Sequence, residues 1–159
     1  LLAATSIGYL FHIDPENIKK AIDSFTGLPM RLEFREFNGI KIISDMYNAN
    51  PASMEVAVRE LARIRKGRSI AVLGDMLELG SYEEEAHREL GRFMSGLPID
   101  IFIAVGVRMA FAASEFRGSV YRLSSAEEAG RFLRDIWGTG DTVLIKGSRG
   151  MHMERVLEG

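Results

Sequence analysis

The sequence lacks cysteine altogether, and this absence removes two classes of structure at once. None of the 159 residues can form a disulfide or supply a thiolate to a metal ion. A chain without cysteine suits a reducing cytoplasm, so we expect a cytoplasmic location. The histidines, His12, His87 and His152, lie far apart in the sequence without companions at metal-ligand spacing. We therefore expect no metal site built by this chain alone.

An excess of one charge and a long hydrophobic run are also absent. The chain has 20 Lys and Arg against 22 Asp and Glu, a formal net charge of -2. This balance gives no basic field for nucleic acid. Apolar residues make up 47% of the chain, but no uninterrupted apolar run approaches the roughly 20 residues that span a bilayer. We expect a soluble globular protein that binds neither nucleic acid nor membrane.

A P-loop is the third absence. The spacing G-x-x-x-x-G-K-S/T occurs nowhere, and in the string Lys146-Gly147-Ser148-Arg149-Gly150 the lysine precedes the turn instead of following it. This string follows a predicted strand at 142–146 and precedes a predicted short helix at 151–157. Backbone amides at a helix start, a hydroxyl and two cations together suit an anion site. The alternative is an ordinary basic loop in solvent.

Residues 40–54 combine a buried strand, a polar corner and a helix start. The apolar run at 40–44 predicts the strand, and Asn50-Pro51 predicts a helix N-cap followed by proline at the first helical position. Asp45 therefore falls at the carboxyl end of a strand, where open α/β sheets hold nucleotides and anionic groups. The alternative is that Asp45 only closes a turn and Asn50 only caps its helix.

The rest of the chain alternates strands and helices. Asn38-Gly39 lies between two strand-like segments and predicts a hairpin of 33–37 with 40–44. Further strands are expected at 69–73, 101–105, 120–123 and 142–146. Helices are expected at 51–66 and 151–157, one more helix begins at 83, one follows the strand at 101–105 and ends at about 116, and one begins at 125. This order specifies an α/β fold with an open, mostly parallel, Rossmann-like sheet of about six strands. One edge strand is antiparallel, and helices cover both faces.

Strand ends also set where the polar residues should gather. Asp45, Asp75 and Lys146 each come at the carboxyl end of a predicted strand, so we expect them at one edge of the sheet. For Asp75 two interpretations stay open: an exposed aspartate in a tight turn, or a residue that lines a nucleotide cleft.

The first 29 residues are expected to be helical and separate from the sheet. Helical spacing covers 1–11, a second helix starts at Asp14-Pro15 and includes Phe25, and Gly27 is expected to stop it. Two short helices cannot bury their apolar faces alone, and the chain opens within an apolar helix without a methionine. We expect 1–29 to be the tail of a preceding domain and 30–159 to form one domain.

Three strings together carry a family resemblance: Asp45-x-Tyr47-Asn48-x-Asn50-Pro51, Gly74-Asp75-Met76-x-Glu78-Leu79-Gly80, and the 146–150 string. With them the chain resembles the carboxyl-terminal domain of the bacterial Mur ligases. Within that family it is most similar to the branch that joins D-alanyl-D-alanine to UDP-N-acetylmuramoyl-tripeptide in peptidoglycan synthesis. The resemblance implies that 1–29 is a helical remnant of the central ATP-binding domain and that Leu28-Pro29-Met30-Arg31 crosses into the last domain.

The resemblance also implies a role for individual residues, none of them a chemical base or nucleophile. On the nucleotide side it implies that Arg31 contacts phosphate, Asp45 the ATP ribose, and Asn48 and Asn50 the same cleft. Lys146, Ser148 and Arg149 are implied to bind the incoming dipeptide. Ser44 stands where relatives often have a second aspartate, which argues against two carboxylates acting together there. The implied task of the domain is to close over ATP and order the reactants.

The implied cofactors are ATP and magnesium, both held mainly by the central domain, which carries the P-loop. In the family, ATP phosphorylates a carboxylate, an amine attacks the acyl phosphate, and magnesium offsets the charge. Implied partners are UDP-N-acetylmuramoyl-tripeptide, D-alanyl-D-alanine and the other domains of the same enzyme. These 159 residues alone are expected to be inactive. Two alternatives remain: the equivalent domain of another Mur ligase or a folylpolyglutamate synthetase, and a non-enzymatic anion-binding α/β module.

Overall fold

The computed structural model describes residues 2–24 and 31–158. Two helices come first, α1 (Leu2–Leu10) and α2 (Pro15–Asp23). The sheet region then runs through β1 (Glu33–Phe37), β2 (Ile40–Asp45), α3 (Pro51–Ile64), β3 (Ser69–Gly74), α4 (Glu83–Ser95), β4 (Ile101–Val105), α5 (Met109–Glu115), β5 (Ser119–Leu123), α6 (Ala126–Ile136) and β6 (Thr142–Lys146). Short 3₁₀ turns are η1 (Gly80–Tyr82), η2 (Arg149–Met151) and η3 (Met153–Val156).

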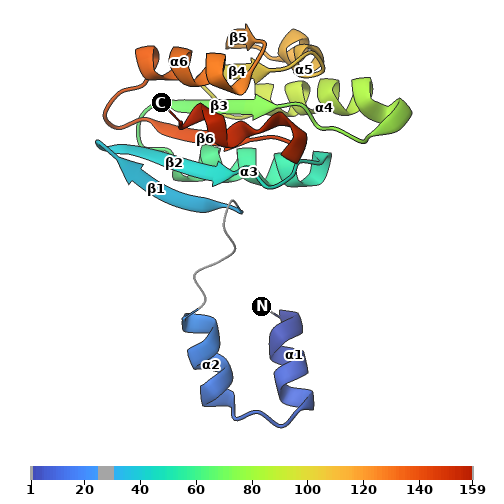
Figure 1. Ribbon diagram of the computed structural model, residues 1–159, viewed down its shortest axis with the longest axis vertical. Helices are drawn as coiled ribbons and strands as arrows, with labels where there is room; N and C mark the ends of the chain where they lie inside the picture. The colour runs from blue at the N-terminus through green and yellow to red at the C-terminus, as the bar shows by residue number, and fades with distance from the viewer. Residues whose placement is uncertain (1, 25–30, 159) are drawn as a thin grey trace.

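The six strands form one sheet in the order β1-β2-β6-β3-β4-β5 (Figure 1). The edge strand β1 is antiparallel to β2, and every other pairing is parallel. The β1–β2 turn has φ of 50° at Asn38 and 75° at Gly39, and positive φ at both central residues is what a tight two-residue hairpin turn requires. The predicted α/β fold is confirmed, including its antiparallel edge strand.

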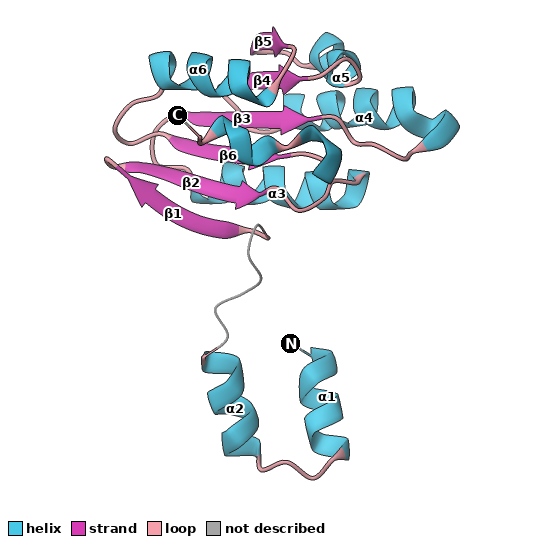
Figure 2. Ribbon diagram, viewed as in Figure 1, coloured by secondary structure: helices cyan, strands magenta, loops and turns pink. Residues whose placement is uncertain are grey.

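The direction of each crossover decides which face its helix covers. The connections β2→β3, β3→β4 and β4→β5 advance along the sheet, whereas β5→β6 returns across it. Because parallel crossovers are right-handed, α3, α4 and α5 pack on one face with one core cluster, and α6 packs on the other with η3 and a second cluster (Figure 2). After β6 the chain therefore turns to one face of the sheet, whereas after β2 and β3 it turns to the opposite face. Such divergence opens crevices at the carboxyl ends of the strands.

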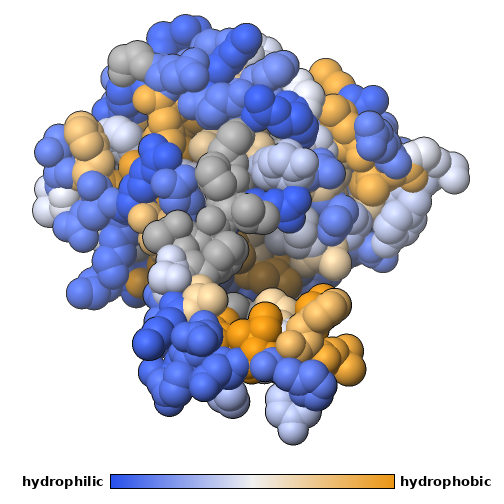
Figure 3. Space-filling view, turned by 60° about the horizontal axis from the view of Figure 1, so that its bottom comes forward, coloured by the Kyte–Doolittle hydropathy of each residue, from blue (hydrophilic) through white to orange (hydrophobic). Residues whose placement is uncertain are grey.

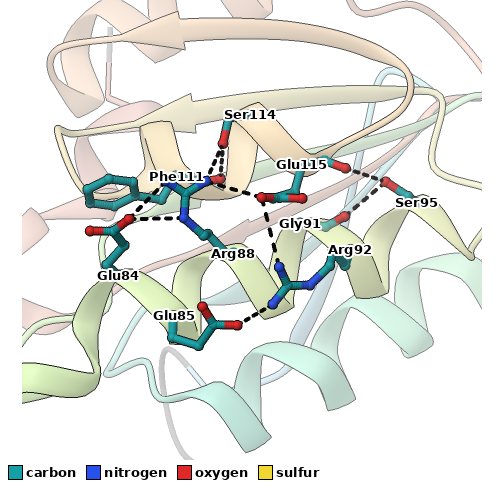
Figure 4. A network of polar contacts seen from close by, with 9 residues as sticks. All are labelled: Glu84, Glu85, Arg88, Gly91, Arg92, Ser95, Phe111, Ser114 and Glu115. Carbon is teal, nitrogen blue, oxygen red and sulfur yellow. Dashed lines mark hydrogen bonds and ion pairs between the residues drawn. The ribbon is translucent and has the colours of Figure 1, made fainter.

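Helices α4 and α5 are held together more closely than any others on their face. Gly91 allows this approach, since a Cβ there would lie 2.2 Å from the carbonyl oxygen of Ala112. Around the contact, the Arg88 guanidinium donates to Glu84 (2.9 Å), Glu115 (3.1 Å) and the Ser114 hydroxyl (3.2 Å), as Figure 4 shows. Hydrogen bonds to Glu84 and Glu115 raise the pKa of the Arg88 guanidinium, so it stays charged.

The expected helix at 151–157 is wrong. The chain instead makes two separate 3₁₀ turns, η2 and η3. His152 between them has φ of 48° and ψ of 45°, a left-handed backbone that no α-helix continues through. Elsewhere the expected boundaries differ by a few residues at most: α3, for example, ends at Ile64 and not Lys66.

The helices α1 and α2 form an antiparallel pair that is drawn apart from the sheet in Figure 1. Large apolar side chains here remain exposed: Leu2 (87%) and Leu10 (75%) on α1, and Phe11 (76%) just after it. In Figure 3, hydrophobic surface is seen on this part of the molecule. The expected features at Phe25, Gly27 and 28–30, and with them the domain boundary, lie outside the described residues. No helix in the described parts of the chain is both long and apolar enough to span a bilayer.

Candidate functional site: two grooves beside the end of β6

The first groove, groove 1, lies where β2 and β6 end beside the start of α3. It has a volume of about 700 Å³ and is lined by Arg31, Leu32, Asp45, Tyr47, Asn48, Asn50, Ala52, Ser53, Val56 and Lys146. All four residues that the family resemblance implied for the nucleotide are in this lining. The structure therefore brings the implied nucleotide set together in one place.

A buried ion pair forms the floor of groove 1. Asp45 and Lys146 are register partners on adjacent parallel strands, and the Lys146 Nζ lies 2.5 Å from Asp45 Oδ2. The same Nζ donates to the carbonyl oxygen of Asn48 at 2.8 Å, and Asp45 Oδ1 accepts from the amide of Leu32 at 3.3 Å. The Lys146 side chain is 1% exposed. Lys146 thus belongs with the nucleotide set in space and holds the loop that follows β2.

Arg31 and Tyr47 form the outer wall of groove 1. The Arg31 guanidinium carbon lies 4.3 Å from the centre of the Tyr47 ring, within the range of a cation–π contact. Both side chains are exposed. A guanidinium in this position is open to an anionic ligand.

Asn50 caps α3 as the sequence predicted. Its side chain accepts from the amide of Ser53 at 2.9 Å, and the Ser53 hydroxyl accepts from the amide of Asn50 at 3.1 Å. Asn48 is also tied locally, because its side-chain oxygen accepts from the amide of Ala49 at 2.8 Å. The positive end of the helix dipole thus faces groove 1, which favours a negatively charged ligand.

The second groove, groove 2, lies on the other side of the loop formed by 47–50. It has a volume of about 550 Å³ and is lined by Tyr47, Asn48, Ala49, Asn50, Leu77, Glu78, Leu79, Ser148, Arg149 and Gly150. Two of the three residues implied for the dipeptide, Ser148 and Arg149, are here, and Lys146 is not. The two grooves share one wall, which runs from Tyr47 to Asn50.

Ser148 is largely buried, and its hydroxyl binds the backbone of residues that line groove 2. It is 3% exposed, and its hydroxyl accepts from the amide of Leu77 at 2.8 Å. The same hydroxyl donates to the carbonyl oxygen of Ala49 at 3.4 Å. Arg149 is exposed, and its guanidinium lies 3.2 Å from Glu154 Oε1. Of the three residues implied for the dipeptide, Arg149 is therefore the one with an exposed charge.

Asp75 fits neither interpretation offered for it, because it is buried and lines neither groove. It is 2% exposed, and its carboxylate accepts from the amides of Arg108 (3.2 Å) and Met109 (2.7 Å) at the start of α5. Arg108 makes a close ion pair with Glu83, and this hydrogen bond raises the pKa of the Arg108 guanidinium. Asp75 is a helix cap, and only its backbone carbonyl reaches the site, where it accepts from the amide of Ser148 at 3.1 Å.

His87 is a supporting residue that the sequence did not reveal. It is fully buried, its Nε2 accepts from the amide of Met76 at 3.1 Å, and its Nδ1 donates to the carbonyl oxygen of Glu83 at 2.7 Å. These partners assign the neutral tautomer with the proton on Nδ1. Nothing in the spacing of His87 on its helix distinguishes it from any other buried position.

The donor set of groove 1 does not suit a magnesium site. Asp45 is the one carboxylate among the described lining residues, and it is already paired with Lys146. No group of three or more His, Asp or Glu side chains in the described part of the chain is arranged to hold a metal ion.

The fold and the grooves define an α/β domain that gathers its polar and charged side chains at the carboxyl ends of parallel strands. Comparison with known families makes this more specific, because the model of the Mur ligase, glutamate ligase domain, matches residues 30–149. The chain belongs to the Mur ligase family. The resemblance inferred from the sequence strings is thereby confirmed.

Two relatives that match nearly the whole of this chain are UDP-N-acetylmuramoyl-tripeptide--D-alanyl-D-alanine ligases. The UDP-N-acetylmuramoyl-tripeptide--D-alanyl-D-alanine ligase of Bacillus subtilis is 34% identical over 99% of this chain and 36% of its own length. The corresponding ligase of Escherichia coli is 30% identical over 98% of this chain and 35% of its own length. The chain thus spans about a third of the length of each of these two relatives.

Solved structures agree with this likeness. MurF from Acinetobacter baumannii superimposes with a TM-score of 0.86 at 31% identity, covering 98% of this chain and 35% of that one. MurF from Thermotoga maritima in complex with ADP gives 0.74 at 32% identity, covering 85% and 31%. The folylpolyglutamate synthase/dihydrofolate synthase of Yersinia pestis, at 20% identity and a TM-score of 0.65, shares the fold.

Proposed function

We propose that this chain is the carboxyl-terminal domain of an ATP-dependent ligase that joins D-alanyl-D-alanine to UDP-N-acetylmuramoyl-tripeptide in bacterial peptidoglycan synthesis. The observation that carries the proposal is the pair of grooves with the shared wall from Tyr47 to Asn50. A ligase must bring a nucleotide and an acceptor amine next to each other, and two adjacent grooves of different lining suit that requirement.

Groove 1 is the proposed nucleotide side. Arg31 supplies an exposed guanidinium for phosphate oxygens, and the start of α3 adds the positive end of a helix dipole. Asn48 and Asn50 offer amide groups on the same wall, and Asp45 is the proposed partner of the ribose hydroxyls. Lys146 fixes Asp45 and the backbone of Asn48, so its proposed role is to set the shape of this side.

Groove 2 is the proposed dipeptide side. Arg149 faces the dipeptide carboxylate in this arrangement, because a guanidinium is always charged and binds carboxylates through two parallel donors. The side chains of Ala49, Leu77 and Leu79 give apolar contacts for two methyl groups. Ser148 holds the loop at Leu77 in place.

In the proposed reaction, the carboxylate of the nucleotide-linked peptide takes the γ-phosphoryl group from ATP and ADP leaves. The dipeptide amine then attacks the acyl phosphate, phosphate leaves, and the nitrogen loses a proton as the amide forms. The described residues of this domain orient the two reactants and exclude water from the acyl phosphate. The 159 residues contain no P-loop, so the proposal assigns them no phosphoryl transfer of their own.

The dipeptide side is tested by titrating the chain with D-alanyl-D-alanine and following backbone amide signals by NMR. We expect saturable shifts around groove 2, and about fivefold weaker binding for Arg149→Gln, the scale of an exposed ion pair. Arg131→Gln, at an exposed position of α6, is the matched control and should bind like the unmodified chain.

Two other results would contradict the proposal. If Arg149→Gln binds D-alanyl-D-alanine as tightly as the unmodified chain does, the dipeptide carboxylate does not bind Arg149. Saturable binding of L-glutamate at groove 2 with no response to the dipeptide would favour another branch of the ligase superfamily.

A further inference from the structure

Groove 2 contains a carboxylate to which the proposed function gives no role. Glu78 lines the groove together with Arg149, Leu77 and Leu79, and its side chain is exposed. The described residues offer its carboxylate no hydrogen bond or ion pair. Groove 2 therefore has one acidic group, one basic group and apolar side chains in its lining.

The backbone that carries Glu78 is fixed in an unusual conformation. Glu78 has φ of 64°, and Gly80 two residues later has φ of 58°. A left-handed backbone is unfavourable for a residue with a side chain and persists where its surroundings determine it.

The surroundings that fix this loop come from two different directions. On the α4 side, the buried His87 accepts from the amide of Met76 at 3.1 Å. On the β6 side, the Ser148 hydroxyl accepts from the amide of Leu77 at 2.8 Å. These bonds hold both residues that precede Glu78, so its carboxylate is presented to groove 2 from a fixed backbone.

We propose that Glu78 is a specificity-determining residue of groove 2, where its carboxylate binds the ammonium group of a small zwitterionic dipeptide whose carboxylate faces Arg149. This inference rests on the proposed function and deepens it, since it defines the substrate class by both of its charged ends. A peptide whose amine is blocked presents no charge to Glu78 and loses this contact.

The test compares D-alanyl-D-alanine with N-acetyl-D-alanyl-D-alanine on the unmodified chain and on Glu78→Gln, by amide shift titration. Glutamine keeps the size and tolerates the same backbone, so the fold should not change. We expect the unmodified chain to bind the free dipeptide about fivefold more tightly than the acetylated one, and Glu78→Gln to bind both equally. Glu36→Gln makes the same charge change on β1 outside both grooves and should keep the preference.

Three outcomes of this titration would overturn the inference. If Glu78→Gln keeps the preference for the free amine, Glu78 does not bind it, and the inference is overturned while the dipeptide site stands. If Glu78→Gln binds both peptides more tightly, Glu78 only offsets the charge of Arg149, which also overturns it. If the unmodified chain binds neither peptide, the proposed function of groove 2 fails together with the inference.

Discussion

Replacing Lys146 with methionine should destabilise the domain by about 3 kcal/mol, because it leaves a largely buried carboxylate without its partner. Methionine fills a similar volume but donates no proton, so both Asp45 and the carbonyl oxygen of Asn48 lose the ammonium that they share. Asp45 is itself only 13% exposed on its side chain, which limits how far water can replace Lys146. Urea unfolding followed by circular dichroism gives the change in free energy.

A double-mutant cycle separates the pair from the loss of packing. Asp45→Asn removes the charge on the other side, and the combination with Lys146→Met should cost clearly less than the sum of the two single changes. Lys66→Met, at an exposed position, should stay within about 0.5 kcal/mol of the unmodified chain. Additive single effects below about 1 kcal/mol would show that the ion pair does not organise groove 1.

Replacing Gly91 with alanine should also destabilise the fold, by about 2 kcal/mol, although alanine is the better helix former. The gain in helix propensity is about 1 kcal/mol, but the added Cβ would lie 2.2 Å from the carbonyl oxygen of Ala112. A backbone atom cannot move aside as a flexible side chain can, so α5 must shift, and overpacking of this kind costs about 1–3 kcal/mol or more.

Gly96 provides the matched control for this substitution. It ends α4 with φ of -87°, and a Cβ there would meet its nearest neighbour at 3.5 Å. Gly96→Ala should therefore be neutral or slightly stabilising. Equal stability of the Gly91 and Gly96 variants in urea unfolding would contradict the close α4–α5 contact.

Much of the fold could be predicted because each signal was local. The hairpin at Asn38-Gly39 follows from two adjacent residues that accept positive φ, and β4 and β6 follow from continuous apolar runs of the kind that buried parallel strands have. The final segment failed for a local reason too. Its composition suits a helix, but the left-handed backbone at His152 depends on packing that no short window of sequence contains.

The site could be predicted only in part, because its contacts join distant residues. Asp45 and Lys146 are 101 residues apart and meet because β6 inserts between β2 and β3, which helix and strand periodicity does not specify. The loop at 47–50 lies between the two grooves, so that Lys146 lines groove 1 and Arg149 lines groove 2 although they are close in sequence. The role of Asp75 could not be predicted for the same reason, because the start of α5 that it caps lies 34 residues further along the chain.

The most direct test of the two-groove arrangement is to map ATP and D-alanyl-D-alanine separately on the chain by backbone amide shifts. ATP should perturb the amides of Leu32, Ala52 and Ser53 in groove 1, and the dipeptide should perturb those of Leu77, Glu78 and Gly150 in groove 2. Shifts on the shared wall, Tyr47 to Asn50, should appear with both ligands. If both ligands perturb the same groove, or if neither perturbs the ends of β2 and β6, the division into a nucleotide side and a dipeptide side is wrong.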